Sequence, residues 1–503
     1  MNPYLKCALT VFAVLIALLI GLVLYIAAIF DPNAYKPQII QLVNEKKQRE
    51  LKLDGDIKLT FFPNLGANVE NIALNEYNSD KEFATAENIL VSLALMPLLK
   101  KQLVVNEITV KGLKANLIRF KDGRMNIDDL IAKGETSEQF KFDIDRVQVE
   151  KTTLAFRDEA SDEQYIFTDV NLRADRANAR SRSMNDAIRS NVKLTFRIDH
   201  PHQAEINLAT SLEFGLVLDF NKQHYAVDGF QLEGKGKVMG IDNLVINSKG
   251  DLFIKPAMHE FVASKLTLGI TGLTGTNNLD IKFDAPRLGL AAGKVTSDTI
   301  TLVAKMTNPE SSTNGNLSLS DMEGTVSDFK SRALTVELEL KKGNLAVKAI
   351  FASPLIGNLD TRQLSLPDLA AFINVNSPGI PDNGINGKLL GNASVEGVSQ
   401  NLQATVAGRF TDSNIKAKLA VTGFVQPVFN FDVDVDQLDL DRFLPQQQGE
   451  EKHTEKAKSA KGLEESLDLS VLKDLKAQGS IRIGLLKATN VKSSRVKLDI
   501  NTL

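Results

Sequence analysis

The sequence Phe429-Asn-Phe-Asp-Val-Asp-Val-Asp436 alternates strictly between apolar and polar residues. Successive side chains of a β-strand point to opposite faces of its sheet. Phe429, Phe431, Val433 and Val435 therefore share one face of the predicted strand, and the asparagine and the three aspartates share the other. Strands with one apolar and one polar face are typical of an antiparallel sheet that has one face in water.

The same alternation recurs through most of the chain after residue 50. It is found at Val192–Ile198, Leu334–Leu340, Ile415–Val421 and Val496–Ile500. Pairs of residues that favour turns separate many of the predicted strands. These pairs are Asp54-Gly55, Asp122-Gly123, Asp228-Gly229, Lys249-Gly250 and Asn383-Gly384. The pattern predicts a mainly β protein with an antiparallel sheet and a few short helices.

An unbroken apolar run, Cys7–Phe30, precedes all of these strands. At about 1.5 Å per residue, this run forms a helix long enough to cross a hydrocarbon core of about 30 Å. The alternative is a cleaved signal peptide, but its apolar stretch is usually only about 7–15 residues long. We therefore expect an uncleaved transmembrane helix at 7–30, with residues 1–6 as a short tail on the other side of the membrane.

The composition of the remaining chain limits its function. The 503-residue chain has a formal net charge of −3, so no broad surface for nucleic acid is expected. Its one cysteine, Cys7, lies in the apolar run, and a thiol-free soluble part suits an oxidising compartment. A chain of this length is too long for one core, which indicates either several domains or an elongated, repetitive fold.

Several local patterns suggest how the chain is organised. Apolar residues at helical spacing predict a short amphipathic helix after Pro37. Val110–Asp122 weakly repeats as Val149–Asp158, with gaps in the alignment, as expected for a sheet that grows by stacking. Arg173–Arg189 is predicted to be an exposed loop. Gln446–Lys461 has no apolar residue larger than alanine, so we expect it to be a disordered linker.

The sequence shows no motif that indicates catalysis or metal binding. His200-Pro-His202 is the closest pair of histidines and is interpreted as a surface turn, because nothing around it completes a metal site. Asp432, Asp434 and Asp436 resemble the start of a calcium loop, but that loop lacks its glycine and its final glutamate. We therefore expect no enzyme activity, no metal and no cofactor.

Three segments of the chain resemble the AsmA family of bacterial envelope proteins. They are the apolar run with the following Phe30–Leu74, then Ala84–Leu130, which ends in DGRMNIDDL, and finally Leu438–Pro445 together with Leu467–Ile500. The motif residues are Pro97, Asp122, Gly123, Arg124 and Asn126. From the residues alone, Asp122-Gly123 is a turn pair, Asn126 caps the next turn, and Pro97 suits the start of a short helix.

The resemblance implies an anchor in the inner membrane and a bulk in the periplasm. It also implies a role in outer-membrane biogenesis, through protein assembly, protein targeting to the membrane, or lipid balance, with outer-membrane assembly components as partners. This chain stops at Leu503 in a predicted strand, whereas similar proteins continue, so we expect a shortened form or an incomplete last module. The predicted regions are the tail (1–6), the transmembrane helix (7–30), an N-terminal AsmA-like β region (31–172), a central β-rich region (173–445), the linker (446–461) and a C-terminal AsmA-like β region (462–503).

The wider superfamily is similar to bridge-like lipid carriers, whose curved sheets present an apolar trough. The resemblance thus implies an elongated, curved, repeating sheet that forms a groove for phospholipid or another envelope lipid. The alternative is a non-catalytic scaffold whose apolar faces pack on each other, and alternation alone does not separate the two. The candidate groove residues are Phe429, Phe431, Val433, Val435, Leu334, Val336, Leu338 and Leu340.

Overall fold

The computed structural model describes residues 31–60, 65–93, 105–131, 144–177, 187–200, 206–219, 221–377, 384–424, 426–440, 476–488 and 491–502. The predicted transmembrane run, Pro97 and the predicted linker lie outside these residues. Within them, no helix is both long enough and apolar enough to span a membrane. The chain divides into two compact units, Met1–Gly240 (unit 1) and Ile241–Leu503 (unit 2).

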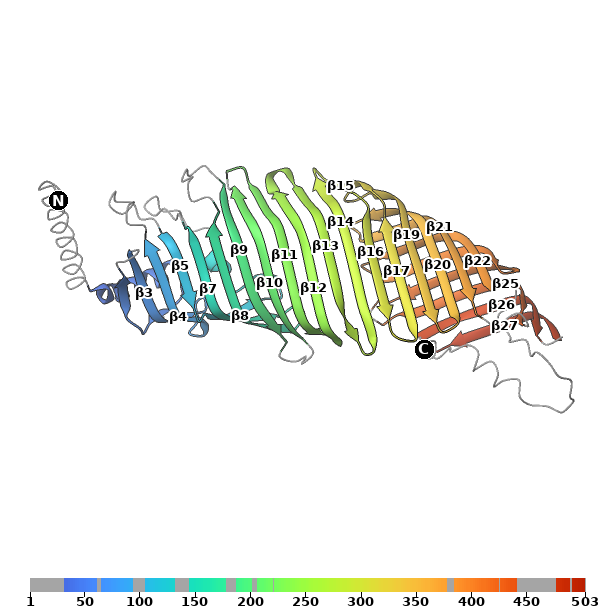
Figure 1. Cartoon of the computed structure of the whole chain (residues 1–503), viewed down its shortest axis with the longest axis horizontal. Coiled ribbons are helices and arrows are strands. Elements are labelled where there is room, and N and C mark those ends of the chain that lie inside the picture. Colours follow the sequence, from blue (N-terminus) through green and yellow to red (C-terminus); the bar gives the residue numbers. More distant parts are fainter. Residues whose placement is uncertain are drawn as a thin grey trace, which may run out of the picture. The chain divides into compact units, whose positions relative to one another are not determined.

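Unit 1 is a sheet with short helical segments near its first strands (Figure 1). The helix predicted after Pro37 is confirmed as α2, but its predicted amphipathic character is not, because none of its residues is buried. The elements of unit 1 are η1 (Pro32–Tyr35), α2 (Lys36–Lys47), β1 (Leu51–Leu53), β2 (Ile57–Thr60), β3 (Leu65–Asn75), β4 (Glu82–Leu93), β5 (Val105–Lys111), β6 (Lys114–Arg119), α4 (Asp128–Ile131), β7 (Arg146–Asp158), β8 (Glu163–Arg176), β9 (Ile188–Asp199), β10 (Asn207–Asp219) and β11 (His224–Val238).

Most neighbouring strands of unit 1 are antiparallel, as predicted. The exception is β7, which runs parallel to both β5 and β6. The chain between β6 and β7 is long enough to return to the same end of the sheet, as a parallel connection requires.

The weak repeat lies at this parallel pairing. Val110 pairs with Val149 and Leu117 pairs with Phe156, so the two copies lie side by side without a gap. Gly112 and Lys151 occupy equivalent positions, and both have a positive φ. The two similar segments therefore lie on neighbouring strands of one sheet, as expected for a sheet that grows by stacking.

Unit 2 is built almost entirely of strands. Neighbouring strands are antiparallel except for β25 and β26, which are parallel. The elements are β12 (Ile241–Lys255), η2 (Pro256–Met258), β13 (Glu260–Thr274), β14 (Asn277–Ala291), β15 (Lys294–Ser297), β16 (Ile300–Thr307), β17 (Ser311–Leu319), β18 (Met322–Thr325), β19 (Phe329–Lys342), β20 (Leu345–Asn358), β21 (Gln363–Asn376), β22 (Ile385–Glu396), β23 (Asn401–Phe410), β24 (Ser413–Thr422), β25 (Val428–Asp439), β26 (Lys476–Ala488) and β27 (Val491–Asn501).

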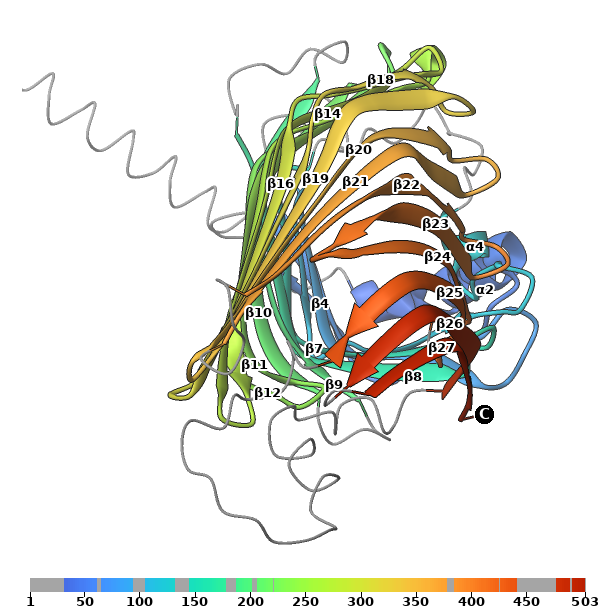
Figure 2. The same ribbon diagram turned by 90° about the vertical axis from the view of Figure 1, so that its right-hand side faces the viewer.

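Irregular positions inside the long strands bend them. The register between β20 and β21 shifts in the stretch that includes Pro354 and Pro367, and Lys265 of β13 has a φ of 53°. Proline lacks the N–H that a ladder needs, and a bulge inserts an unpaired residue and bends its strand. The later strands of unit 2 accordingly curve along their length (Figure 2).

Two predicted turns are bulges instead. Gly229 lies inside β11 and Gly250 lies inside β12, and the register of each strand shifts beside them. A glycine with positive φ, such as Gly229, serves a bulge as well as a turn. Asp54-Gly55 lies between β1 and β2, as predicted, and Asp122-Gly123 lies in a turn between β6 and α4. Asn383 lies outside the described residues.

Two further expectations need correction. Arg173–Arg176 belongs to β8 and Arg189 belongs to β9, so the predicted arginine-rich loop is wrong at both ends. His200 is buried rather than part of a surface turn: its Nε2 lies 3.0 Å from Oε2 of Glu163, and its ring stacks edge-on against Tyr165. The sequence does not reveal these contacts, because they join the start of β8 to the end of β9.

The strands of unit 2 form one hydrogen-bonded series, and few of their large apolar side chains are buried in the described residues. A compact cluster of buried apolar side chains in unit 2 is formed by Val295 of β15, Phe329 of β19 and Leu355 of β20. Most of the apolar face of the sheet therefore lies outside any closed core.

Candidate functional site

One face of the unit 2 sheet is apolar from β13 to β27. Side chains of directly paired residues point to the same side of a sheet. Following the pairs from strand to strand gives an unbroken row on what we call the apolar face of unit 2. The row is Leu268, Phe283, Leu302, Leu317, Val336, Phe351, Ala371, Leu389, Gly408, Ile415, Val435, Ile483 and Val496.

The structure places both predicted sets of groove residues on this face. Val336 of β19 and Val435 of β25 belong to the same row, although about a hundred residues separate them in sequence. Leu334 differs from the others because it packs against the buried cluster around Phe329. Leu334 therefore lies at the edge of a closed core, whereas the other candidates lie along the open part of the face.

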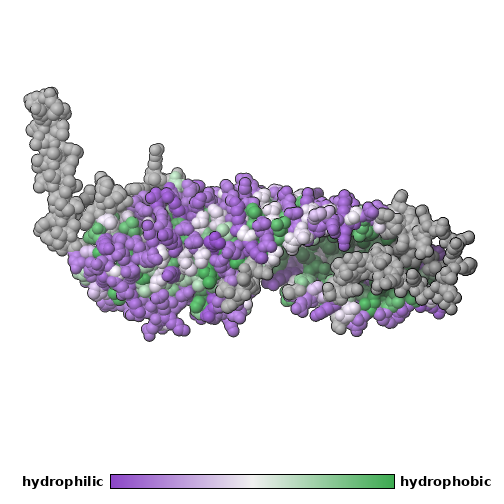
Figure 3. All heavy atoms as spheres, turned by 60° about the horizontal axis from the view of Figure 1, so that its bottom comes forward, coloured by the Kyte–Doolittle hydropathy of each residue, from purple (hydrophilic) through white to green (hydrophobic). Residues whose placement is uncertain are grey.

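Large side chains on this face remain accessible. Leu338 is 43% exposed, Leu419 is 42% exposed and Leu498 is 48% exposed. Figure 3 shows hydrophobic residues gathered in a hollow of the surface on the side of unit 2. Large contiguous apolar surfaces are rare on soluble monomers and usually mark a binding site.

Phenylalanine rings lie over glycines on this face. Phe431 pairs with Gly479, Phe410 with Gly387 and Phe329 with Gly357. A Cβ at Gly479 would lie 2.7 Å from the ring of Phe431. Because glycine has no side chain, each phenylalanine ring can lie over the neighbouring strand instead of projecting from the face.

The opposite face of the same strands is charged. Arg482 of β26 bonds Asp434 of β25 at 2.6 Å and approaches Asp432 at 2.6 Å. The hydrogen bond from Arg482 holds the pKa of Asp434 below its usual value. Of the aspartates that resembled a calcium loop, Asp432 and Asp434 therefore form ion pairs across to β26, and Asp436 accepts hydrogen bonds from Asn414.

Unit 1 has an apolar face of its own. Pairing again connects one aliphatic residue on each of nine strands, and we call this the apolar face of unit 1. The row is Ile57, Val69, Ile89, Val110, Val149, Leu172, Leu194, Leu212 and Leu232. Each unit is therefore two-faced along its own sheet.

A buried arginine fixes the first strands of unit 1. Arg49 is 1% exposed, and it donates to both carboxylate oxygens of Asp129 at 2.7 Å and to the carbonyl of Asn75 at 3.0 Å. Its guanidinium also lies 4.8 Å from the ring centre of Phe83. The bond from Arg49 lowers the pKa of Asp129. This network ties the end of α2 to the DGRMNIDDL segment and the β3–β4 hairpin.

The family-motif residues surround this network. Asn126 is buried: its Nδ2 donates to Glu76 at 2.8 Å and its Oδ1 accepts from the backbone of Ile118 at 2.9 Å. Asp122 and Arg124 form an exposed ion pair at 2.7 Å, and Gly123 takes the positive φ of the turn. The capping role expected for Asn126 is thus a structural one. Arg49 and Asp129 were not singled out from the sequence, since an arginine in a charged stretch gives no sign of burial.

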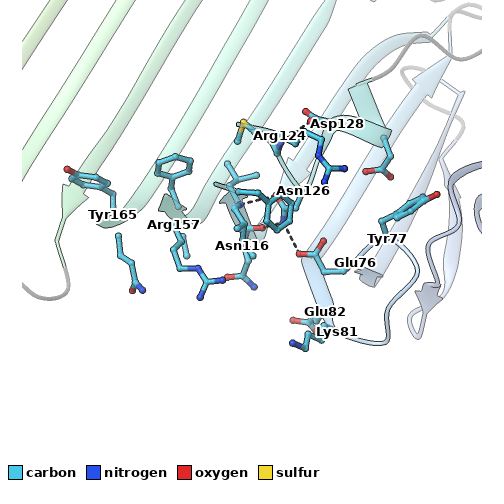
Figure 4. A pocket seen from close by; sticks show the side chains of 18 of the residues that line it. Glu76, Tyr77, Lys81, Glu82, Asn116, Arg124, Asn126, Asp128, Arg157 and Tyr165 are labelled. Carbon is cyan, nitrogen blue, oxygen red and sulfur yellow. Dashed lines mark hydrogen bonds between the residues drawn. The ribbon is translucent and has the colours of Figure 1, made fainter. Parts of the chain in front are cut away.

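A cavity of about 940 Å³ lies beside the motif residues, entirely within unit 1. Its apolar lining includes Leu117, Phe120, Phe156, Tyr165 and Ile166. Figure 4 shows Lys81 and Glu82 together at one side of the cavity and Arg124 with Asp128 at another. The cavity therefore combines an apolar floor with charges of both signs.

Fold and site together define a protein with open sheets that each carry an apolar face. The sequence model of the AsmA family matches residues 1–501, and the chain belongs to that family. Over 179 residues it is 25% identical to Protein AsmA of Escherichia coli (strain K12). The aligned part is 34% of this chain and 28% of that relative, so the chain covers less than a third of the relative's length. No solved structure matches. Family membership indicates an envelope-related function.

Proposed function

We propose that this chain is a non-catalytic envelope biogenesis factor that holds lipid acyl chains on its apolar faces. In this proposal, residues 7–30 anchor it in the inner membrane and the sheets lie in the periplasm. It acts in outer-membrane assembly, in protein targeting to the membrane or in lipid homeostasis. The observation that carries the proposal is the continuous apolar row from Leu268 to Val496, with exposed apolar side chains on the same face beside it.

The physical basis is the hydrophobic effect. Each CH₂ group removed from water gains about 0.8 kcal/mol, so an acyl chain along a row of Leu, Val, Ile and Phe side chains binds without polar contacts. The bend of the strands turns a flat apolar face into a trough. The exposure of Leu338, Leu419 and Leu498 shows that protein side chains leave this surface accessible.

A scaffold without lipid is the second candidate function. The buried cluster of Val295, Phe329 and Leu355 favours it locally, because there the apolar face packs on protein. If the whole face behaved like that cluster in the assembled protein, partner proteins would cover it instead of lipid.

A pair of matched substitutions separates these functions. Leu338 is 43% exposed on the apolar face, and Leu390 is 56% exposed on the opposite face of the same sheet. We expect Leu338→Asp in the full chain to lower the phospholipid retained after exchange into amphipol, as measured by mass spectrometry of the extract. Leu390→Asp should retain as much lipid as the unchanged chain. Equal retention by both variants, with unfolding curves unchanged, would contradict lipid carriage.

A further inference from the structure

The cavity of unit 1 has charged side chains next to an apolar floor, which the apolar face of unit 2 lacks. Its floor contains Leu117, Phe156 and Tyr165, which pair across β6, β7 and β8 and so lie on one face. One step along the same strands, Leu154 pairs with Phe167, which pairs with Ile198. The floor of the cavity is therefore an extension of the apolar face of unit 1, and an acyl chain can leave the cavity along that face.

Most of the charged groups at the cavity already have partners. Asp129 receives both bonds of Arg49, and Asp128 accepts from the backbone N–H of Met125 at 2.9 Å. Arg124 pairs with Asp122 at 2.7 Å, and Arg157 pairs with Glu159 at 2.9 Å. These groups shape the rim, but little of their charge is left for a ligand.

Lys81 and Glu82 are different. Both side chains are exposed and line the cavity, and in the described part of the chain neither makes an ion pair or a side-chain hydrogen bond. They lie next to each other at one side of the cavity (Figure 4). The ammonium group of Lys81 and the carboxylate of Glu82 are therefore available to a ligand in a cavity whose floor is apolar.

This arrangement matches a ligand that carries both charges and an apolar tail. We propose that the cavity binds the headgroup of a zwitterionic phospholipid with a primary amine, with Lys81 at the phosphate and Glu82 at the ammonium. The cavity of about 940 Å³ lies within the range of about 300–1,000 Å³ usual for ligand sites. An anionic headgroup such as glycerol phosphate lacks the cation for Glu82 and meets its negative charge instead. The inference rests on the proposed function for the source of the lipid and adds selection by headgroup.

The chain contains no tryptophan, which allows a site-specific probe. Tyr77 lines the cavity and is 49% exposed, so Tyr77→Trp should disturb the fold little. We would titrate the full chain bearing Tyr77→Trp, in amphipol, with dihexanoyl phosphatidylethanolamine, dihexanoyl phosphatidylglycerol and free phosphoethanolamine, each below its micelle concentration. Tryptophan fluorescence reports only on ligand at the cavity.

The expected result is a saturable blue shift with phosphatidylethanolamine at an affinity at least threefold higher than with phosphatidylglycerol. Free phosphoethanolamine should bind far more weakly, because it lacks the acyl chains. Equal affinities for free phosphoethanolamine and for phosphatidylethanolamine would show that the ligand of the cavity is not a lipid.

Glu82→Gln should abolish the preference between the two lipids, chiefly by improving the binding of phosphatidylglycerol. A structural defect would not produce such a gain. Lys81→Gln should weaken both lipids by about threefold to tenfold. Lys52→Gln, an exposed change on β1 away from the cavity, should alter neither.

Equal affinities for both lipids in the unchanged cavity, or an unaltered preference in Glu82→Gln, would overturn the inference. Its failure is distinguishable from that of the proposed function, because the Leu338→Asp comparison measures long-chain lipid on unit 2 alone. If the tryptophan responds to phosphatidylethanolamine but the chain retains no long-chain lipid, the proposed lipid carriage is wrong and the headgroup site stands. If long-chain lipid is retained but the tryptophan does not respond, the headgroup site is wrong and lipid carriage stands.

Discussion

Unit 1 and unit 2 use the same alternating strands for different purposes. In unit 1 the most exposed large hydrophobic residues, such as Leu42, Tyr77 and Met239, lie outside the strands, and a buried arginine network fixes the first strands. In unit 2 large apolar side chains such as Leu338, Leu419 and Leu498 stand exposed on the apolar face itself. Period-two patterning therefore specifies which residues share a face, but not whether that face is stabilised by polar anchoring or left open for a ligand.

The largest expected effect of a single change is at the anchor of unit 1. Arg49→Met leaves Asp129 without its partner, and breaking a buried ion pair costs about 3–5 kcal/mol. Because Asp129 keeps 22% of its side-chain exposure, we expect a loss near the lower end, about 3 kcal/mol. Urea denaturation of the full chain, with hydrogen exchange of β1–β4, measures it.

The matched control is the exposed pair of Lys58 and Glu70, which bond at 2.9 Å. Lys58→Met should leave the denaturation curve nearly unchanged, since exposed pairs contribute little. Similar losses from Arg49→Met and Lys58→Met would show that the first strands of unit 1 do not depend on the buried network.

A smaller effect is expected on the apolar face of unit 2. Gly479→Val places a side chain against the ring of Phe431 and against its carbonyl oxygen. Overpacking of this kind costs about 1–3 kcal/mol, and it should also push the ring out of the surface. Gly269→Val is the control, because the nearest atom to a Cβ there, the carbonyl oxygen of Asn247, is 3.9 Å away. A stable Gly479→Val variant with an unchanged unfolding midpoint would refute the packing of Phe431 over glycine.

The smallest effect is a pH dependence confined to unit 1. Arg49 holds the pKa of Asp129 below its ordinary value of 3.8. A carboxyl with a lowered folded pKa contributes stability that is complete above its unfolded pKa and is lost as the pH falls through the folded one. Protection of β1–β4 from hydrogen exchange should therefore be constant above about pH 5 and fall below pH 3.8. Asp129→Asn should be less protected at pH 7 and should lack the acid-induced step; a step that persists in this variant would assign it to another group.

Sequence patterns predicted the strands and their faces well. The alternation at Phe429–Asp436 and at Leu334–Leu340 correctly indicated two-faced strands, because a period of two depends only on local backbone geometry. The resemblance of three segments assigned the chain to the AsmA family, and the match to the sequence model of that family confirmed the assignment. The predicted anchor and linker lie outside the described residues and stay predictions.

Contacts and strand pairings between residues far apart in the chain could not be predicted from the sequence. Gly229 and Gly250 looked like turn glycines, but the same backbone freedom serves a bulge, and only the neighbouring strand decides between them. The parallel pairing of β25 with β26 depends on where a long connection returns the chain. Arg49 and His200 gave no sign of burial, since their partners lie far away in sequence.

The most direct test of the central claim asks what touches each face of one strand. A photoreactive benzoylphenylalanine at Leu419 would project from the apolar face of β24, and the same residue at Lys418 would project from the charged face. We predict that illumination of the full chain in native membranes gives a phospholipid adduct at position 419 and none at 418, detected as an intact-mass increase. Equal adducts at both positions, or protein adducts alone at 419, would contradict lipid carriage on the apolar face.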